Sequence, residues 1–188
     1  KVMESSRLLC ATRHGPGGVD DWNLRLHSIH AQATQTSARD PFVPGDPVMM
    51  TKNDYQRNLF NGDQGLVVQR RDHETERLYA VFRDANGFRS FLLDGLREHL
   101  ELCYAMTVHK SQGSEFNTVG VVLPDQDASN LSRELLYTAV TRSRKCVLFI
   151  GAPRHIDQAI ARPVQRTSAL GELIQALITE DSAREEGC

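Results

Sequence analysis

The sequence lacks a long apolar run. None of its hydrophobic stretches approaches the roughly 18 residues that a membrane-spanning helix requires. The first residues, KVMESSRLLC, do not show the charged and then apolar pattern of a secretory signal. Both absences argue against a membrane or secreted protein, and we expect a cytoplasmic location with no membrane partner.

Cysteine is scarce as well. The sequence contains Cys10, Cys103, Cys146 and Cys188, and no two of them form a Cys-x-x-Cys pair. The first three lie in or beside apolar runs, which favours small buried side chains over a disulfide framework or a zinc site. The sequence therefore predicts no metal site built from cysteine.

Two signatures of an independent nucleotide site are missing. No G-x-x-x-x-G-K-[ST] loop occurs, and no apolar strand ends in the paired carboxylates that hold Mg²⁺ near a phosphate. This chain therefore has no visible means to cradle a triphosphate or its metal unaided. Any nucleotide site has to be completed from elsewhere.

A length of 188 residues with 40% hydrophobic and 24% charged residues predicts one folded core, or a core with a small satellite domain. The net charge of −2 gives no hint of nucleic acid, but the charges are uneven. Residues 131–166 carry seven Lys or Arg against two acidic residues, whereas residues 171–188 carry five acidic residues against Arg184 alone. Such a basic cluster can meet phosphates, although a solvated helix face explains most clusters of this kind.

The two ends of the sequence show the alternating strand and helix patterns of an α/β protein. RLLCATR is a compact apolar run, HGPGG breaks it, and apolar residues then recur at helical spacing from Val19 to Ile29. Past residue 100 we predict strands in LCYAMTV, NTVGVVLP and KCVLFIGA, a helix in SRELLYTAVTRS, and an amphipathic helix at 169–178 before an acidic tail. A strand that feeds a helix through a glycine-rich turn is typical of a parallel sheet.

The middle of the chain differs. Short β-type runs fill residues 45–100 and are separated by turn signals such as Asn61-Gly62, which favours a small antiparallel barrel or sandwich. The sequence thus predicts a small β module that interrupts an α/β domain.

The stretch AMTVHKSQGSEF places many hydrogen-bonding groups after an apolar run. Ligands of open parallel sheets bind outside the carboxyl ends of the strands, so we expect these side chains at that edge, around a glycine that lets the backbone pass close to a ligand. A polar solvent loop is the simpler alternative. The candidates are Thr107, His109, Lys110, Gln112, Gly113, Ser114 and Glu115.

Two arginines are further candidates. Arg142 comes seven residues after Leu135, so it lies near the apolar side of its helix, where a guanidinium needs an anion. That anion is either a carboxylate of the protein or a phosphate, which suits the fork geometry of arginine. Arg13, with His14, follows the first strand, and we expect it at the same sheet edge as the HKSQGSE segment.

These stretches carry a resemblance to a known family. AMTVHKSQGSEF followed by RELLYTAVTRSRK resembles the fifth and sixth motifs of RecD-like superfamily 1 DNA helicases. LLCATRHGPGGVDDWN and GDPVMMTKNDYQRNLFNGDQG resemble preceding segments of the same family, so the resemblance runs from about Arg7 to Arg166.

The resemblance implies a fold and its division. We expect an α/β RecA-like parallel sheet, the second helicase motor domain, which is like a P-loop NTPase but without the P-loop, with an inserted small SH3-like β-barrel. Its first part would be residues 1–44, the barrel 45–100, the remainder 101–170, and a C-terminal helix with its acidic tail 171–188. The phosphate loop and metal carboxylates would belong to a missing amino-terminal domain.

The resemblance also implies roles. Arg142 matches the arginine finger that reaches the γ-phosphate, and Arg13 a second arginine that approaches it. Glu115, Gly113 and Gln112 would be on the nucleotide side. Residues expected to contact DNA are Thr107, His109, Lys110 and Ser114, with Asn53, Tyr55 and Asn61 on the barrel.

The implied function is that of the carboxy-terminal half of an ATP-dependent 5′-to-3′ helicase subunit of an exodeoxyribonuclease V repair and recombination complex. Its ligands would be ATP and Mg²⁺, and its partners single-stranded DNA and RecB- and RecC-like subunits. Two alternatives stay open. One is a related superfamily 1 helicase of relaxase or stand-alone type, and the other is a non-catalytic module that docks a protein of the complex.

Overall fold

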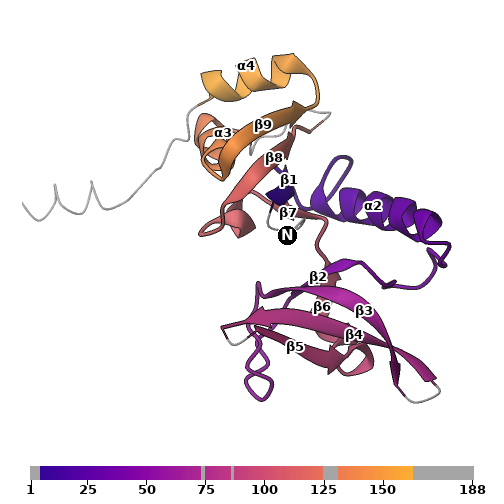
Figure 1. Ribbon diagram of the computed structural model, residues 1–188. Coiled ribbons are helices and arrows are strands. Elements are labelled where there is room, and N and C mark those ends of the chain that lie inside the picture. Colours follow the sequence, from indigo (N-terminus) through magenta and orange to yellow (C-terminus); the bar gives the residue numbers. More distant parts are fainter. Residues whose placement is uncertain (1–4, 73–74, 86, 125–130, 163–188) are drawn as a thin grey trace, which may run out of the picture.

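The structure, a computed structural model, describes residues 5–72, 75–85, 87–124 and 131–162. Its strands form two sheets, one of four strands and one of five (Figure 1). The four-stranded sheet is built from both ends of the described chain, and the five-stranded sheet lies between them in sequence. Among the residues described, no helix is long and apolar enough to cross a membrane.

The four-stranded sheet is entirely parallel, in the order β7-β1-β8-β9. Its strands are β1 (Ser6–Cys10), β7 (Ala105–Thr107), β8 (Phe116–Val122) and β9 (Ser143–Ile150). Cys10 pairs with Thr107 on one side and with Val122 on the other. The carboxyl ends of β1, β7 and β8 therefore share one edge, and this result confirms the predicted parallel α/β sheet.

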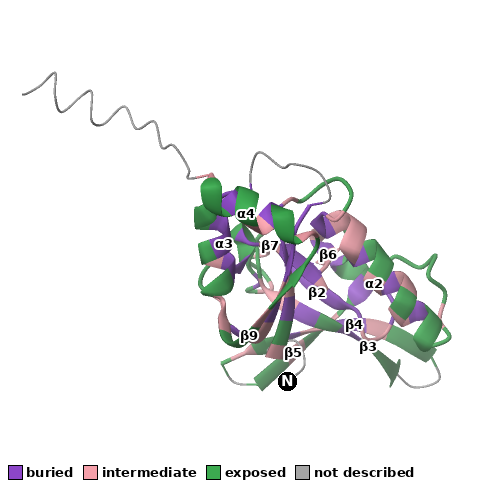
Figure 2. Cartoon of the chain, turned by 90° about the horizontal axis from the view of Figure 1, so that it is seen from above, coloured by how far each residue is buried: buried purple, intermediate pink, exposed green. Residues whose placement is uncertain are grey.

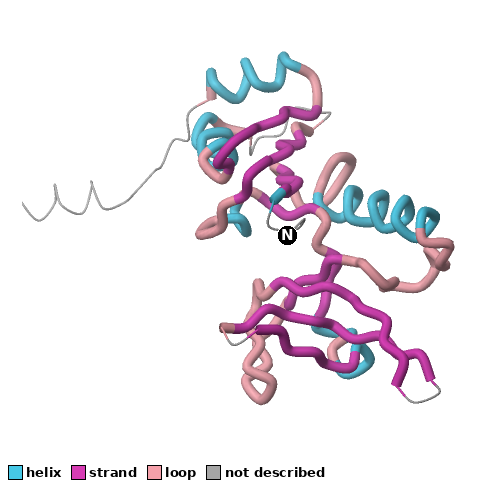
Figure 3. The backbone as a smooth tube through the Cα atoms, in the orientation of Figure 1, coloured by secondary structure: helices cyan, strands magenta, loops and turns pink. Residues whose placement is uncertain are grey.

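Helices cover both faces of this sheet (Figure 3). Helix α2 (Val19–Ala33) packs on one face, where Val19 joins Cys10, Ala105 and Val122. Asp20 and Asp21 occupy its first turn, where the helix dipole favours negative charge. Helices α3 (Arg133–Val140) and α4 (Pro153–Ala161) pack on the other face.

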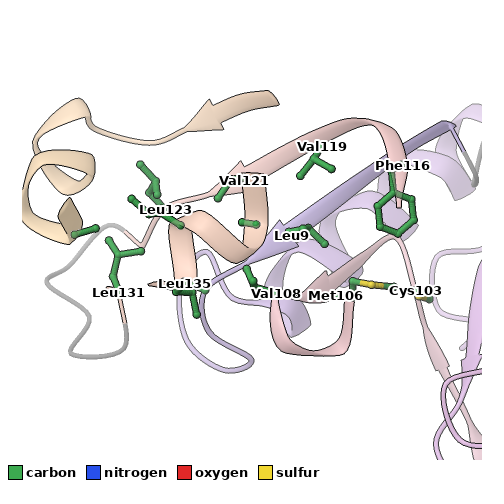
Figure 4. Packing of buried hydrophobic residues seen from close by; sticks show 14 of the residues in the cluster. Leu9, Cys103, Met106, Val108, Phe116, Val119, Val121, Leu123, Leu131 and Leu135 are labelled. Atoms are coloured by element: carbon green, nitrogen blue, oxygen red, sulfur yellow. The ribbon is translucent and has the colours of Figure 1, made fainter. Parts of the chain in front are cut away.

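The core between the sheet and α3 and α4 is drawn in Figure 4. Leu9, Val119 and Val121 are fully buried there, and Leu135 of α3 packs against them. Ser132 caps the amino end of helix α3, where its hydroxyl accepts a hydrogen bond from the amide of Leu135 at 3.2 Å. This cap and core fix α3, and so fix where Arg142 lies after its end.

The five-stranded sheet is antiparallel, in the order β5-β4-β3-β2-β6. It has its own core, which includes Val48, Met50, Val67 and Leu93. A closed SH3-like barrel stays a prediction, since the strand order only shows β5 and β6 at the two ends. The strands are β2 (Pro47–Met50), β3 (Gln64–Asp72), β4 (Thr75–Asp84), β5 (Gly87–Leu92) and β6 (Leu100–Leu102), with short 3-10 turns η1 (Leu93–Gly95) and η2 (Arg97–His99) before β6.

Buried polar contacts join the two sheets. The carboxylate of Asp46, just before β2, lies 2.9 Å from Nδ1 of His27 on α2 and accepts the Tyr104 hydroxyl at 2.7 Å. Burial, with the hydrogen bond to Asp46, raises the pKa of Tyr104. Arg7 of β1 donates to the side chain of Gln64 on β3 at 2.6 Å and to the carbonyl of Cys103 at 2.7 Å. Direct contacts thus set the position of the inserted sheet.

Three sequence predictions need comment. LCYAMTV is not one strand, because Leu102 ends β6 in one sheet and Ala105 begins β7 in the other. Cys10 and Cys103 are buried as predicted, but Cys146 is exposed because it lies on β9, the edge strand of the sheet. The predicted helix at 169–178 and the acidic tail lie outside the described residues. Helix α4 was not predicted.

Candidate functional site

Two cations meet one carboxylate beyond the carboxyl ends of β1 and β7. Nη2 of Arg13 donates to Oε2 of Glu101 at 2.6 Å, and Nζ of Lys110 donates to Oε1 of the same carboxylate at 2.8 Å. Arg13 follows β1, Lys110 lies in the 3-10 turn η3 (His109–Ser111) after β7, and Glu101 lies on β6. One carboxylate of the inserted sheet therefore contacts two segments of the parallel sheet.

The charges of this group support one another. Burial alone would raise the pKa of the Glu101 carboxyl, but hydrogen bonds from Lys110 and Arg13 outweigh it and hold the pKa below its usual value. The same contact with Glu101 raises the pKa of Arg13. Glu101 therefore stays ionised, and Arg13 stays charged, at neutral pH.

The glycine-rich turn before α2 is not an open phosphate cradle. A helix amino terminus binds anions through free backbone amides. Here Gly17 donates to the Asp21 carboxylate at 2.9 Å, and Gly18 donates to the carbonyl of Gly15 at 3.0 Å. The amides of Val19 and Asp20 bond to the carbonyls of residues 12 and 13. These amides are already used, so an anion at this edge would depend on side chains.

The segment after β7 crosses from one edge of the sheet to the other. It leaves β7 at Thr107, whose hydroxyl accepts the amide of Lys110 at 3.2 Å, and it enters β8 at Phe116, the amino end of that strand. Gly113 turns the backbone with a φ of +84°, a conformation that other residues rarely adopt. His109 and Lys110 thus lie near one edge, while Ser114 and Glu115 lie at the opposite edge, with exposed Gln112 between them.

The edge at the amino ends of β8 and β9 contains Arg142. Its guanidinium donates to three neutral acceptors: the carbonyl of Thr138 at 3.2 Å, the carbonyl of Ser114 at 3.4 Å and the hydroxyl of Thr141 at 3.3 Å. Within the described part of the chain, no carboxylate forms an ion pair with it. Arg142 is therefore held in one orientation, half-buried, with its charge not neutralised by a described residue.

Glu115 and Arg142 are far apart in the sequence but lie at the same edge of the sheet. Phe116, the next residue, pairs with Ser143, and Glu115 forms an ion pair with Arg144 at 2.7 Å. Both side chains are more than half exposed, so this ion pair adds little stability. The ion pair holds the guanidinium of Arg144 near the start of β9, two residues after Arg142.

Arg13 and Arg142 do not meet. Cys10, three residues before Arg13, pairs with Val122, whereas Phe116, whose amide bonds to the carbonyl of Arg142, lies six residues earlier on β8. Six residues of strand span roughly 20 Å. The expectation that Arg13 and the whole HKSQGSE segment share one edge with Arg142 and Glu115 is therefore wrong, because the segment crosses the sheet.

The three candidates on the inserted sheet do lie together. The amide nitrogen of Asn53 donates to the hydroxyl of Tyr55 at 3.1 Å, and its oxygen accepts the backbone amide of Asn61 at 2.8 Å. Tyr55 is 77% exposed and packs edge-to-face with the ring of Phe60 at a centroid distance of 6.3 Å. The loop between β2 and β3 therefore offers an exposed aromatic pair with polar neighbours.

Sequence reasoning missed Glu101 and Arg144. Glu101 lies in an apolar run, ELCYAM, where a single charge looks incidental. Arg144 belongs to the basic cluster of residues 131–166, and its position two residues after Arg142 in the run TRSRK was the available signal.

With this geometry established, the comparisons identify relatives. Residues 102–150 match the UvrD-like helicase C-terminal domain. The RecBCD enzyme subunit RecD of Mycolicibacterium smegmatis is 40% identical over 169 residues, which cover 90% of this chain and 29% of that protein. The ATP-dependent RecD2 DNA helicase of Deinococcus radiodurans is 38% identical over 173 residues, which cover 90% of this chain and 23% of that protein.

The chain belongs to the RecD-like helicases. It spans less than a third of the length of these relatives, so it corresponds to a part of them. Among solved structures, the Pif1 helicase from Bacteroides in complex with ADP-AlF3 and ssDNA matches with a TM-score of 0.55 and 16% identity, over 96% of this chain and 47% of that chain. At that identity the likeness concerns the fold alone, and it confirms the helicase-type α/β fold.

The described part of the chain offers no cluster of metal ligands. Among the described residues, no group of three or more His, Cys, Asp or Glu side chains is arranged to hold a metal. The guanidinium groups of Arg142 and Arg144 suit phosphate oxygens instead. No step of the chemistry below is therefore derived through a metal held by this RecD-like chain.

Proposed function

We propose that this RecD-like chain is the carboxy-terminal part of an ATP-dependent 5′-to-3′ DNA helicase subunit of an exodeoxyribonuclease V complex. In this proposal residues 1–44 and 101–170 form the second RecA-like motor domain, residues 45–100 an SH3-like barrel, and 171–188 a terminal helix and tail. The observation that carries the proposal is the orientation of Arg142, held by three neutral acceptors and lacking a carboxylate among the described residues.

The nucleotide side of the proposal is the edge at the amino ends of β8 and β9. ATP, with its Mg²⁺, would be held mainly by a preceding domain, and the guanidinium of Arg142 would contact the γ-phosphate across the cleft. Charge builds on the phosphoryl oxygens during transfer, and an arginine placed there stabilises it. Glu115, Gly113 and Gln112 remain the proposed neighbours of the nucleotide, with Glu115 holding Arg144.

The DNA side is the opposite edge together with the inserted sheet. We assign Thr107, His109 and Lys110 to the backbone of a single strand, and now Arg13 with them, since its partner Glu101 also holds Lys110. The exposed loop of Asn53, Tyr55 and Asn61 would support bases by stacking, which tolerates any sequence. Ser114, whose carbonyl accepts Arg142, would link the two sides.

The two sides together describe a motor. The segment from Thr107 to Phe116 connects the DNA-binding edge to the nucleotide edge, so a movement of the chain at one end would shift the residues at the other end. RecB- and RecC-like subunits, and a cytoplasmic location, belong to the proposal through the relatives named RecD. A separate docking role for the chain is not needed to explain Arg142.

The intact protein that carries this chain tests the proposal. We expect ATP hydrolysis stimulated by oligothymidylate, and unwinding of a duplex with a 5′ single-stranded tail but not of one with a 3′ tail. The 188-residue chain alone is expected to hydrolyse no ATP. Unwinding from the 3′ tail would contradict the polarity, and robust hydrolysis by the isolated chain would contradict the shared nucleotide site.

A further inference from the structure

In the group formed by Arg13, Lys110 and Glu101, the carboxylate is less exposed than the two cations. The side chain of Glu101 is 21% exposed, whereas those of Arg13 and Lys110 are 43% and 36% exposed. The carboxylate therefore lies inside, with each of its oxygens bound to one cation, and the two cations lie outside. Glu101 itself is fixed by the pairing of β6 with β2, where it faces Met49.

Both cations keep donors that no described residue uses. A guanidinium has five N–H donors and an ammonium has three, and in the structure each cation spends one on Glu101. Arg13 also has its Nε 3.8 Å from Asp20, whose other oxygen contacts His14 at 2.6 Å. The remaining donors are available to the oxygens of a phosphodiester.

We propose that Glu101 is a positioning residue of the inserted sheet, which holds Arg13 and Lys110 at the places where both contact the phosphates of one DNA strand. The inference rests on the proposed function and adds to it a residue from the other sheet. Without Glu101, two long flexible side chains from separate segments have to be ordered by DNA alone, which costs binding free energy.

The proposal and simple charge counting predict opposite changes in DNA affinity when the carboxylate of Glu101 is removed. Removal of a carboxylate near a DNA site lowers the repulsion of phosphate, so charge alone predicts tighter binding by Glu101→Gln. A positioning role predicts weaker binding, although the variant is more positive. The direction of the change therefore separates the two explanations.

The test measures the affinity of the intact protein for a fluorescein-labelled oligothymidylate, without nucleotide, over a range of salt. We expect Glu101→Gln to bind several-fold more weakly than wild type, with a salt slope lower by between about 0.7 and 1.4, since up to two phosphate contacts on a single strand are lost. Arg13→Gln and Lys110→Gln are expected to lose affinity as well. When Arg13→Gln and Lys110→Gln are combined, the addition of Glu101→Gln should cause no further loss of affinity.

Glu98→Gln is the matched control, because Glu98 is an exposed carboxylate three residues away, before β6. It should bind as tightly as wild type or more tightly, and thermal unfolding should show that all variants are folded. Equal or tighter binding by Glu101→Gln, or an equal loss in Glu98→Gln, overturns the inference while leaving the proposed function intact. Failure of the wild-type protein to bind the oligothymidylate overturns both.

Discussion

The arginines at the two edges of the parallel sheet have different kinds of partner. At the carboxyl edge, Arg13 is bound to the carboxylate of Glu101, with Lys110 on the other oxygen. At the amino edge, the partners of Arg142 among the described residues are two carbonyls and a hydroxyl. The first arrangement offsets part of the charge of two cations within the protein, whereas the second orients a charge and leaves it for an external anion.

This difference indicates what each edge is suited to bind. A guanidinium with a neutral set of acceptors gains most when a highly charged group arrives, as in the transfer of a phosphoryl group. Two cations that share one carboxylate keep a net positive charge and donors for phosphate oxygens, which suits a DNA strand. Figure 2 shows the burial of the sheet and its covering helices between these edges.

The largest effect is expected at the amino edge. Arg142→Ala in the intact protein should lower ATP turnover by on the order of 10³, because it removes the charge that we propose stabilises the transferring phosphoryl group. Binding of oligothymidylate in the absence of nucleotide should be unchanged, since Arg142 lies away from Lys110 and Arg13. Steady-state hydrolysis and fluorescence anisotropy measure the two. Turnover within a few-fold of wild type would remove Arg142 from this role.

The division into edges could be predicted from the sequence only in part. The parallel strands, the interrupting β module and the helix before Arg142 follow from periodicity and turn residues, and the structure bears out the parallel sheet. The crossing of the segment 108–115 follows from the parallel order of β7 and β8, since the chain has to pass from the carboxyl end of one strand to the amino end of the next, but the sequence does not show at which residue it does so. Polar residues adjacent in sequence were therefore assigned to one edge.

Pairings between distant segments were also beyond the sequence. Glu101 lies 88 residues from Arg13, and nothing local indicates that they meet. His27 and Asp46 are another example: each looks like an ordinary surface residue, yet both are buried because α2 docks beside the start of β2. Side chains whose partners come from another sheet can be found only after the sheets are placed.

The next effect concerns the sheet that both edges share. Leu9 is fully buried between the strands and the α3 and α4 helices, so Leu9→Ala should lower the free energy of unfolding by about 2–5 kcal/mol. Because the change strikes the common core, ATP turnover and DNA binding should decline together on warming. Chemical denaturation measures the first quantity. Leu24→Ala, at a side chain 63% exposed on α2, is the control and should change stability little.

The smallest expected effect is a pH dependence of thermal stability, which differs between the two edges. The folded pKa of Glu101 lies below its unfolded value, so its contribution to stability is present above the unfolded pKa, about 4.3, and is lost as pH falls through the folded pKa. Wild type should therefore exceed Glu101→Gln in thermal midpoint at pH 6, and the gap should close as the pH falls toward 3. Arg142, which has no carboxylate among its described partners, supplies the contrast: the midpoint difference between wild type and Arg142→Gln should stay constant over the same range. A gap for Glu101→Gln that widens on acidification would show that Arg13 and Lys110 do not hold this carboxylate ionised, and the two edges would then no longer differ in the way described.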